Sequence, residues 1–208
     1  MSRTVIARPV TLVEPGTVRL ERLLPGPLER VWAYITESDK RARWLCAGEF
    51  DLRVGGKVTL EFDNSRLSGE QNPRGRGAHV STGVITRLEP PRLLAHTWEW
   101  KGQDTEVTYE LTPRGKDVLL VLVHRRLEGR ELVPQVMGGW DVHTGILEDL
   151  LKGVAPRPFW KTHAKLAEEY AAALGAAFRS VSRCRQHDRA GSPAVQTPAL
   201  VLFPPVRY

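Results

Sequence analysis

Residues 134–153 constrain the fold more than any other stretch of the chain. Side chains recur there at three- and four-residue spacing, which is typical of one buried face on a helix; they are Val133, Met137, Trp140, Thr144, Leu147 and Leu151. Pro134 is tolerated in a first helical turn, and Gly153 suits the C-terminal cap. A helix from Pro134 to Leu151 would be about 27 Å long at about 1.5 Å per residue. Because strand-like segments precede it, we expect this helix to close a sheet.

The segments before this helix are predicted to be strands, because apolar and polar side chains alternate in most of them and glycine or proline separates them. They cover residues 17–24, 49–54, 57–62, 80–88, 93–100, 105–112 and 118–124. Tight turns between them predict an antiparallel sheet, and the long helix that follows predicts an α+β fold. After the first strand we expect one helix opening at Pro27 and a shorter one reaching Trp44. The polar stretch 63–77 is expected to be a mobile loop.

These elements are expected to form one domain over residues 17–178, with an appendage at each end. Residues 1–16 hold short apolar pieces interrupted by proline, which predicts an N-terminal arm or an extra edge strand. A last helix begins at Phe159 and is expected to stop or weaken at Gly175, since glycine is a poor helix former. Residues 179–208 contain prolines, scattered arginines and no sustained periodicity, so we expect a disordered basic tail.

The formal net charge of +6 lies mostly in that tail. Residues 179–208 carry five arginines and one aspartate, which leaves +2 for the rest of the chain. A domain so near neutrality has no obvious phosphate-binding stripe, so we expect no nucleic-acid partner. No apolar run approaches the roughly 18 residues of a membrane span, and the amino terminus lacks a signal-peptide core, which predicts a cytoplasmic protein with no membrane partner. Cys46 and Cys184 have no disulfide or metal spacing.

Motifs for common chemistry are missing from the sequence. No phosphate-binding loop, dinucleotide fingerprint or serine-hydrolase elbow occurs, and no cofactor is expected. The histidines show no zinc-site spacing and are expected to be hydrogen-bonded structural residues; they are His79, His96, His124 and His143. Glu99, Glu106 and Glu110 either line a pocket as an acid–base pair with raised pKa values or form a solvated sheet face.

Glycines and tryptophans give further candidates for a binding site. Gly138 and Gly139 each cost about 1 kcal/mol relative to alanine inside a helix. They indicate either close approach of the helix to the sheet or room for a ligand beside Trp140. Trp32 and Trp140 are expected in the core or in a cavity wall, and Trp44 is expected to guard the mouth of the cavity.

Several groups of residues, in this order, carry a resemblance to a known family. They are Arg22 with residues 27–32; Trp44; residues 53–56; residues 90–94 with Thr97 and Trp98; residues 107–112; and Gly139 and Trp140 with His143. Over roughly residues 17–174 the chain resembles the SRPBCC (START-like, birch-pollen-allergen-like) superfamily, and within it the bacterial homologues of the activator of heat-shock protein 90 ATPase. The resemblance implies a helix-grip fold, in which a curved antiparallel sheet wraps around a long C-terminal helix and a hydrophobic cavity lies between them. The chain departs from the family pattern after His143, where Thr144 and Gly145 stand in place of the usual leucine and aspartate.

The strand series and the aromatic helix predict a non-enzymatic protein that binds a small hydrophobic or amphipathic ligand between sheet and helix. The expected lining consists of Trp98, Tyr109, Leu111, Met137, Trp140, Thr144 and Leu147, with no metal and no catalytic group. Two alternatives stay open. One is a co-chaperone-like partner that stimulates the ATPase of a heat-shock protein 90 homologue in a stress response, which the resemblance implies. The other is a cyclase or aromatase of the kind found elsewhere in the superfamily. The sequence is compatible with a monomer or a homodimer.

Overall fold

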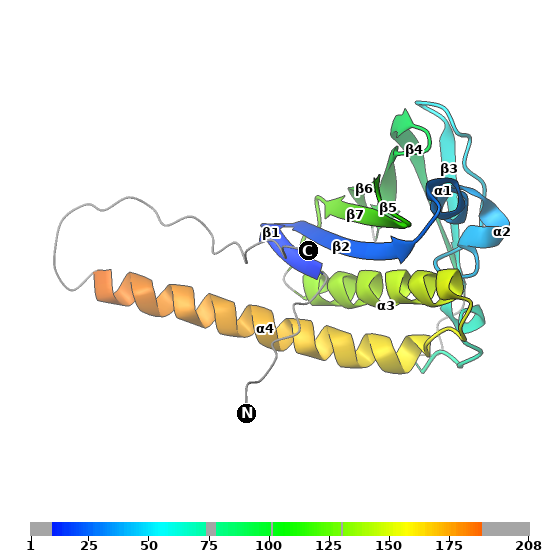
Figure 1. The fold of residues 1–208 in the computed structure, drawn as a ribbon. Coiled ribbons are helices and arrows are strands. Elements are labelled where there is room, and N and C mark those ends of the chain that lie inside the picture. The colour runs from blue at the N-terminus through cyan, green and yellow to red at the C-terminus, as the bar shows by residue number, and fades with distance from the viewer. Residues whose placement is uncertain (1–9, 74–77, 101, 130, 189–208) are drawn as a thin grey trace.

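Among the described residues, seven antiparallel strands form one open sheet that curves around the long helix α3 (Leu132–Lys152) (Figure 1). The structure is a computed structural model, and it describes residues 10–73, 78–100, 102–129 and 131–188. The strands are β1 (Val10–Glu14), β2 (Thr17–Pro25), β3 (Lys57–Phe62), β4 (His79–Glu89), β5 (Leu93–Trp100), β6 (Gln103–Arg114) and β7 (Asp117–Arg125). The α+β class and the antiparallel sheet expected from the sequence are confirmed.

The order of the strands explains how the two edges of the curved sheet are connected. It runs β1-β2-β7-β6-β5-β4-β3, so consecutive hairpins lead from β3 to β7, whereas β2 lies beside β7. Two helices, α1 (Leu28–Thr36) and α2 (Ser38–Arg41), carry the chain from β2 to β3 at the far edge. They therefore bridge the opening between the two ends of the curved sheet (Figure 1).

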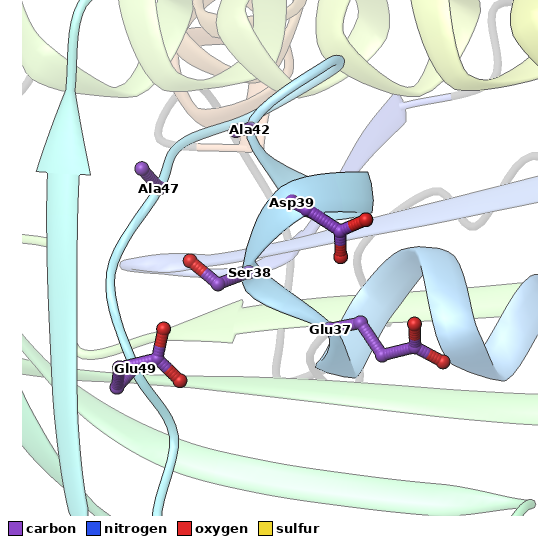
Figure 2. Close-up of a pocket in the computed structure, with 6 residues that line it drawn as sticks. All are labelled: Glu37, Ser38, Asp39, Ala42, Ala47 and Glu49. Atoms are coloured by element: carbon purple, nitrogen blue, oxygen red, sulfur yellow. The ribbon is translucent and has the colours of Figure 1, made fainter.

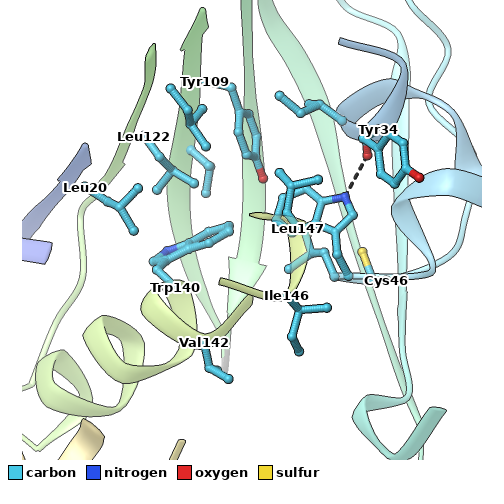
Figure 3. Close-up of a cluster of buried hydrophobic side chains, with 14 of the residues drawn as sticks. Leu20, Tyr34, Cys46, Tyr109, Leu122, Trp140, Val142, Ile146 and Leu147 are labelled. Carbon is cyan, nitrogen blue, oxygen red and sulfur yellow. Dashed lines mark hydrogen bonds between the residues drawn. The ribbon is translucent and has the colours of Figure 1, made fainter. Parts of the chain in front are cut away.

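Helix α3 is buried on nearly every side because it lies between the sheet and a second long helix, α4 (Phe159–Asp188) (Figure 1). Leu20 and Leu122 reach toward α3 from neighbouring strands, and Trp140 meets them from the helix (Figure 3). Gly153 ends α3 at a φ of 71°, a left-handed conformation that favours glycine. The predicted C-terminal helix and the helix-grip arrangement are confirmed, and α3 begins at Leu132 rather than Pro134.

A buried ionic network joins β2 to both long helices. The Arg22 guanidinium donates from Nη2 to Asp141 Oδ1 over 2.6 Å and from Nη1 to Glu148 Oε2 over 3.0 Å. The Tyr170 hydroxyl donates to the other oxygen of Asp141 over 2.8 Å. Since the side chains of Arg22 and Asp141 are each only 10% exposed, this pairing replaces solvation that both charges lose on folding.

The strand expected over residues 49–54 does not form. Instead the segment makes one isolated bridge, from Phe50 to Val58, and Ala47, just before it, makes another to Glu61. It then turns tightly, with the Arg53 amide donating to the Asp51 carbonyl over 2.7 Å. Alternating hydrophobicity was a weak guide here because turns of this kind fix the backbone through local hydrogen bonds.

The loop after β3, which the sequence predicts to be mobile, makes hydrogen bonds with the start of α4. It contains the short 3₁₀ helix Asn64–Arg66. The amide of Phe159 donates to Ser68 Oγ over 3.0 Å, and that of Trp160 donates to Glu70 Oε2 over 2.9 Å. The first amides of a helix lack partners within the helix and attract negative charge, so this loop supplies the N-terminal cap of α4. Residues 74–77 lie outside the described residues.

The two ends of the chain differ from expectation in part. Residues 10–14 form the edge strand β1, which was one of the two possibilities for the N-terminal arm; residues 1–9 lie outside the described part.

Helix α4 continues past Gly175 to Asp188, so assigning residues 179–188 to a disordered tail was wrong. Alanines at 171–173 and 176–177 surround Gly175, and their high helix propensity offsets the cost of one glycine. The rest of the predicted tail, 189–208, is not described. None of the described helices has the length and apolar character to cross a membrane.

Candidate ligand-binding site

All residues predicted to line the site are buried in the core that the sheet and α3 form. Trp98 lies on β5, Tyr109 and Leu111 lie on β6, and the others lie on α3; these are Met137, Trp140, Thr144 and Leu147. None is more than 4% exposed, and all except Thr144 belong to one hydrophobic cluster. Figure 3 labels three of them, Tyr109, Trp140 and Leu147. The Thr144 hydroxyl donates to the Trp140 carbonyl over 2.7 Å, which satisfies it within the helix.

Trp140 is the centre of this cluster. Its indole meets three rings from three strands nearly edge-on: the ring centroid lies 5.8 Å from that of Trp98, 6.1 Å from that of Tyr109 and 6.0 Å from that of His124. Edge-to-face contacts at these distances are favourable because the positive edge of one ring meets the negative face of another. The indole Nε1 also donates to His124 Nδ1 over 3.1 Å. One side chain of α3 thus contacts β5, β6 and β7 at once.

The hydrogen bonds of His124 determine its tautomer. Indole Nε1 is only a donor, so Nδ1 of His124 has to carry the lone pair and Nε2 the proton. Nε2 lies 2.9 Å from Thr105 Oγ1 and donates to it, and the Thr105 hydroxyl donates to the Trp98 carbonyl over 2.7 Å. Burial lowers the pKa of His124 to about 3, so the imidazole is neutral near pH 7. It therefore holds Trp140 and Thr105 in place rather than carrying charge.

A stack of four nearly parallel rings runs from the surface into this site. It begins at exposed His79 and continues through Phe62 and Trp98 to buried His124. Successive centroids are 4.8, 5.1 and 5.4 Å apart, with interplanar angles of 9°, 8° and 11°. Phe62 and His124 were missing from the predicted lining, although the alternation in strands 57–62 and 118–124 places them on the buried face.

His143 lies outside the site, on the side of α3 that faces α4. Its Nδ1 donates to the Trp44 carbonyl over 2.7 Å, and its ring lies 4.8 Å from that of Phe159. Burial lowers the pKa of His143 to about 4. Trp44 is itself 0% exposed and donates to the Tyr34 carbonyl over 2.7 Å, so the prediction that it guards a cavity mouth is wrong.

The glutamates considered for catalysis do not reach the site. Glu99, Glu106 and Glu110 alternate with residues of the buried face, so they project from the opposite, convex face of the sheet. Glu106 accepts a hydrogen bond from the Thr86 hydroxyl there, and Glu99 and Glu110 are exposed. The possibility of a buried acid–base pair made from these three residues is therefore wrong.

Gly138 and Gly139 have different surroundings. A Cβ atom on Gly138 would lie 3.0 Å from the backbone nitrogen of Ala167, so this glycine permits close approach to α4 rather than to the sheet. A Cβ atom on Gly139 would meet nothing within 4 Å. At Gly145, which departs from the family pattern, a Cβ atom would lie 2.3 Å from Nη1 of Arg157. That space lets Arg157 reach Asp149, which accepts from its Nε and Nη2 over 2.7 Å each.

Alanine substitutions at the paired glycines should have different effects. Gly139→Ala should raise the free energy of unfolding by about 1 kcal/mol, since alanine is the better helix former and the space is open. Gly138→Ala gains the same propensity but pushes α4 away from α3, and such overpacking costs about 1–3 kcal/mol. Urea denaturation should therefore find Gly138→Ala less stable than Gly139→Ala by at least about 1 kcal/mol. Equal stabilisation by the two changes would show that α4 yields freely at Ala167.

A solvent-open pocket on the described surface lies elsewhere, beside α2 (Figure 2). Its lining is Glu37, Ser38, Asp39, Ala42, Ala47 and Glu49. Glu37 already pairs with Lys40, and Ser38 Oγ accepts from the Gly48 amide over 3.1 Å. No group of three or more metal-ligating side chains occurs in the part of the chain that the structure describes.

Comparisons with known proteins identify the family. The model of the family described as activator of Hsp90 ATPase homolog 1-like protein matches residues 25–152. The chain belongs to this family. Its match begins at the end of β2 and ends with α3, so it contains every residue of the candidate site. No curated protein matches the chain.

Solved structures share the fold. A protein from Bordetella parapertussis is 39% identical, with a TM-score of 0.67 over 82% of this chain and 94% of that one. CalU16 from Micromonospora echinospora is 26% identical, with a TM-score of 0.58 over 75% of this chain and 86% of that one. DynU16, described as a putative protein of the dynemicin biosynthetic locus, is 22% identical, with a TM-score of 0.53 over 68% of this chain and 49% of that one, and shows the fold alone.

Proposed function

We propose that this protein binds a small hydrophobic or amphipathic ligand between the sheet and α3, without catalysis. The observation that carries the proposal is the convergence on Trp140 of buried rings from three strands. The proposed lining is the predicted set: Trp98, Tyr109, Leu111, Met137, Trp140, Thr144 and Leu147. Aromatic and aliphatic walls with a few placed polar groups are typical of small-molecule sites. Family membership agrees with ligand binding or a cyclase-like role.

Trp140 is the side chain that an entering ligand has to meet. It contacts its neighbours edge-on and is held by one hydrogen bond, to His124. An aromatic ligand that slides against Trp98 or Tyr109 replaces a ring contact of the same kind, so the exchange loses little ring–ring attraction.

The other candidate functions have less support. A co-chaperone role has only the family description behind it. A cyclase requires an acid–base group in the site. The glutamates considered for that purpose lie on the convex face, and burial lowers the pKa values of the site's histidines to about 4 for His96 and about 3 for His124, so both are weak bases near pH 7. We further propose that the protein acts in the cytoplasm as a monomer or homodimer.

Thermal shift and tryptophan fluorescence with a panel of lipids, aromatics and polyketides test the proposal. A true ligand at about 100 times its Kd should stabilise the fold by about 2.7 kcal/mol and change the fluorescence. Trp140→Phe should remove most of the ligand-induced fluorescence change, whereas the matched control Trp160→Phe, at the start of α4, should keep it. Leu111→Phe adds volume to the lining without removing a hydrogen bond and should weaken binding about tenfold or more. A panel in which no compound shifts the melting temperature would contradict the proposal.

A further inference from the structure

Helix α4 extends well past the helix against which it packs. A Cβ atom on Gly138 would lie 3.0 Å from the backbone nitrogen of Ala167, so these positions lie side by side in the two antiparallel helices. Helix α3 begins at Leu132, six residues before Gly138, and the position six residues after Ala167 is Ala173. The rest of α4, residues 174–188, is about 22 Å long at about 1.5 Å per residue, and we call it the overhang. Figure 1 shows this end of α4, in orange, beyond the sheet and α3, with no described element beside it.

The overhang continues the apolar face by which α4 packs on the domain. Ala167 and Tyr170 are buried, and Leu174 is half-buried against the hydrophobic cluster. The same spacing of three and four residues continues in the sequence with Phe178 and Val181. An isolated helix shorter than about 12–15 residues is marginal in water, and most helices in proteins are stabilised by packing of an apolar face. The overhang therefore requires a partner that covers this face.

The charges along α4 fit a second copy of the same helix in antiparallel orientation. A two-fold axis at residue 176 sets Glu168 of one copy within about one residue of the level of Arg183 and Arg185 of the other. It also sets Lys165 within about one residue of the level of Asp188. Glu168 and Lys165 are both exposed. A parallel pair would instead set each charge beside its own copy, and like charges repel, so the antiparallel orientation is favoured.

The docked half of α4 has a free side along which the partner helix can lie. Ala164, Glu168 and Ala171 are exposed and recur at the spacing of one helix face. Residues 181–188 of an antiparallel partner reach the level of residues 164–171, so they lie along this row. The small side chains of Ala164 and Ala171 permit close approach there. Because both copies make the same contacts, the arrangement closes as a dimer and leaves no free end for further copies.

We propose that a second copy of this chain covers the overhang, so that two α4 helices pair antiparallel about a two-fold axis near residue 176. Leu174 of each copy meets Phe178 of the other at the centre, and Glu168 of each pairs with Arg185 of the other. The interface does not include the candidate ligand site, so this inference is independent of the proposed function. Two helices alone form a small interface, and we expect a dissociation constant on the order of 10 μM.

Sedimentation equilibrium of the full chain tests the proposal. Between about 1 and 300 μM the average mass should rise from that of one chain to that of two. Phe178→Glu sets a charge at the centre of the pair and should weaken dimerisation about a hundredfold. The matched control Ala176→Glu lies on the opposite side of the helix by its period and should leave the dissociation constant within about threefold.

Exchange of the paired charges tests the orientation. Glu168→Arg and Arg185→Glu should each weaken the dimer about tenfold, because each change sets like charges opposite one another twice in the dimer. The variant with both changes should regain the affinity of the unaltered chain. The two positions are about 25 Å apart along one helix, so this recovery cannot arise within a single copy.

Three outcomes would overturn the inference. One is the mass of a single chain at every concentration, which would mean that something other than a second copy covers the overhang. Another is a dimer that Phe178→Glu leaves unchanged, since the two chains would then meet elsewhere. The third is a double charge exchange that does not restore the affinity lost in the two single variants, because the helices would then not pair in this orientation.

Discussion

Lowering the pH from 7 to 5 should reduce the free energy of unfolding by about 5 kcal/mol. Three histidines are buried and neutral, and burial is the largest cause of their lowered pKa values, about 4 for His96, about 3 for His124 and about 4 for His143. In the unfolded chain each titrates near its ordinary value of 6.5. Between these values the unfolded state binds more protons than the folded state, so stability is complete above about pH 6.5 and falls as the pH falls.

Urea denaturation at pH 8, 7, 6 and 5 checks this prediction. Near pH 5 the slope should correspond to about three protons taken up on unfolding, or about 1.4 kcal/mol per pH unit for each histidine. His96→Phe removes one of them and should lower the slope to about two protons. The pKa values of Glu148 and Asp149 are also lowered, but these carboxyls lose their contribution only below their ordinary values of 4.5 and 3.8. A stability that does not change between pH 7 and 5 would show that the three rings are hydrated.

Replacing Asp141 with alanine should lower the free energy of unfolding by about 3–5 kcal/mol. The substitution leaves the Arg22 guanidinium, only 10% exposed, without the carboxylate that lies 2.6 Å from it. It also removes the acceptor of the Tyr170 hydroxyl, so β2, α3 and α4 lose their shared contact. Urea denaturation at pH 7.5 measures the loss.

Two control variants separate the charge from the packing. Tyr170→Phe removes one hydrogen bond to the same carboxylate and should cost about 1.5–3 kcal/mol. The double change Arg22→Met with Asp141→Leu replaces the pair with apolar groups of similar size. It should recover part of the stability, because Glu148 keeps its pairing with Lys152 while the Tyr170 hydroxyl still lacks its acceptor. If Asp141→Ala alone costs less than about 1 kcal/mol, the network is solvated and contributes little.

Patterns within single elements predicted most of the fold. The bounds of β3 and β5 agree with the expected strands, because alternation over 57–62 and 93–100 records which side chains are buried. The three- and four-residue spacing of apolar side chains from Val133 to Leu151 likewise predicted helix α3. The segment 49–54 was assigned wrongly, since its turn depends on hydrogen bonds that alternation does not record. The family resemblance supplied the helix-grip arrangement that these elements adopt.

The candidate site was predictable only as a set of apolar positions. Its polar contacts depend on strand register, which places His96 and His124 in one row across β6. In that row His124 has two hydrogen-bond partners and His96 has one. Trp44 looked suited to a cavity mouth, yet its amphipathic side chain is buried against the Tyr34 carbonyl. Residue type alone does not distinguish these environments, because histidine and tryptophan suit cores and binding sites equally well.

The sequence by itself determined the class of elements, their order and the buried face of each. Apolar side chains recur along the chain with the period of the helix or strand that buries them. Only the tertiary structure decided which elements touch. It placed β2 beside β7, and it set Gly138 against α4 rather than the sheet. It also paired Arg22 with Asp141 across 119 residues. These contacts arise from packing between distant segments, where close fit and the need to satisfy buried charges select one arrangement among many that share the same local pattern.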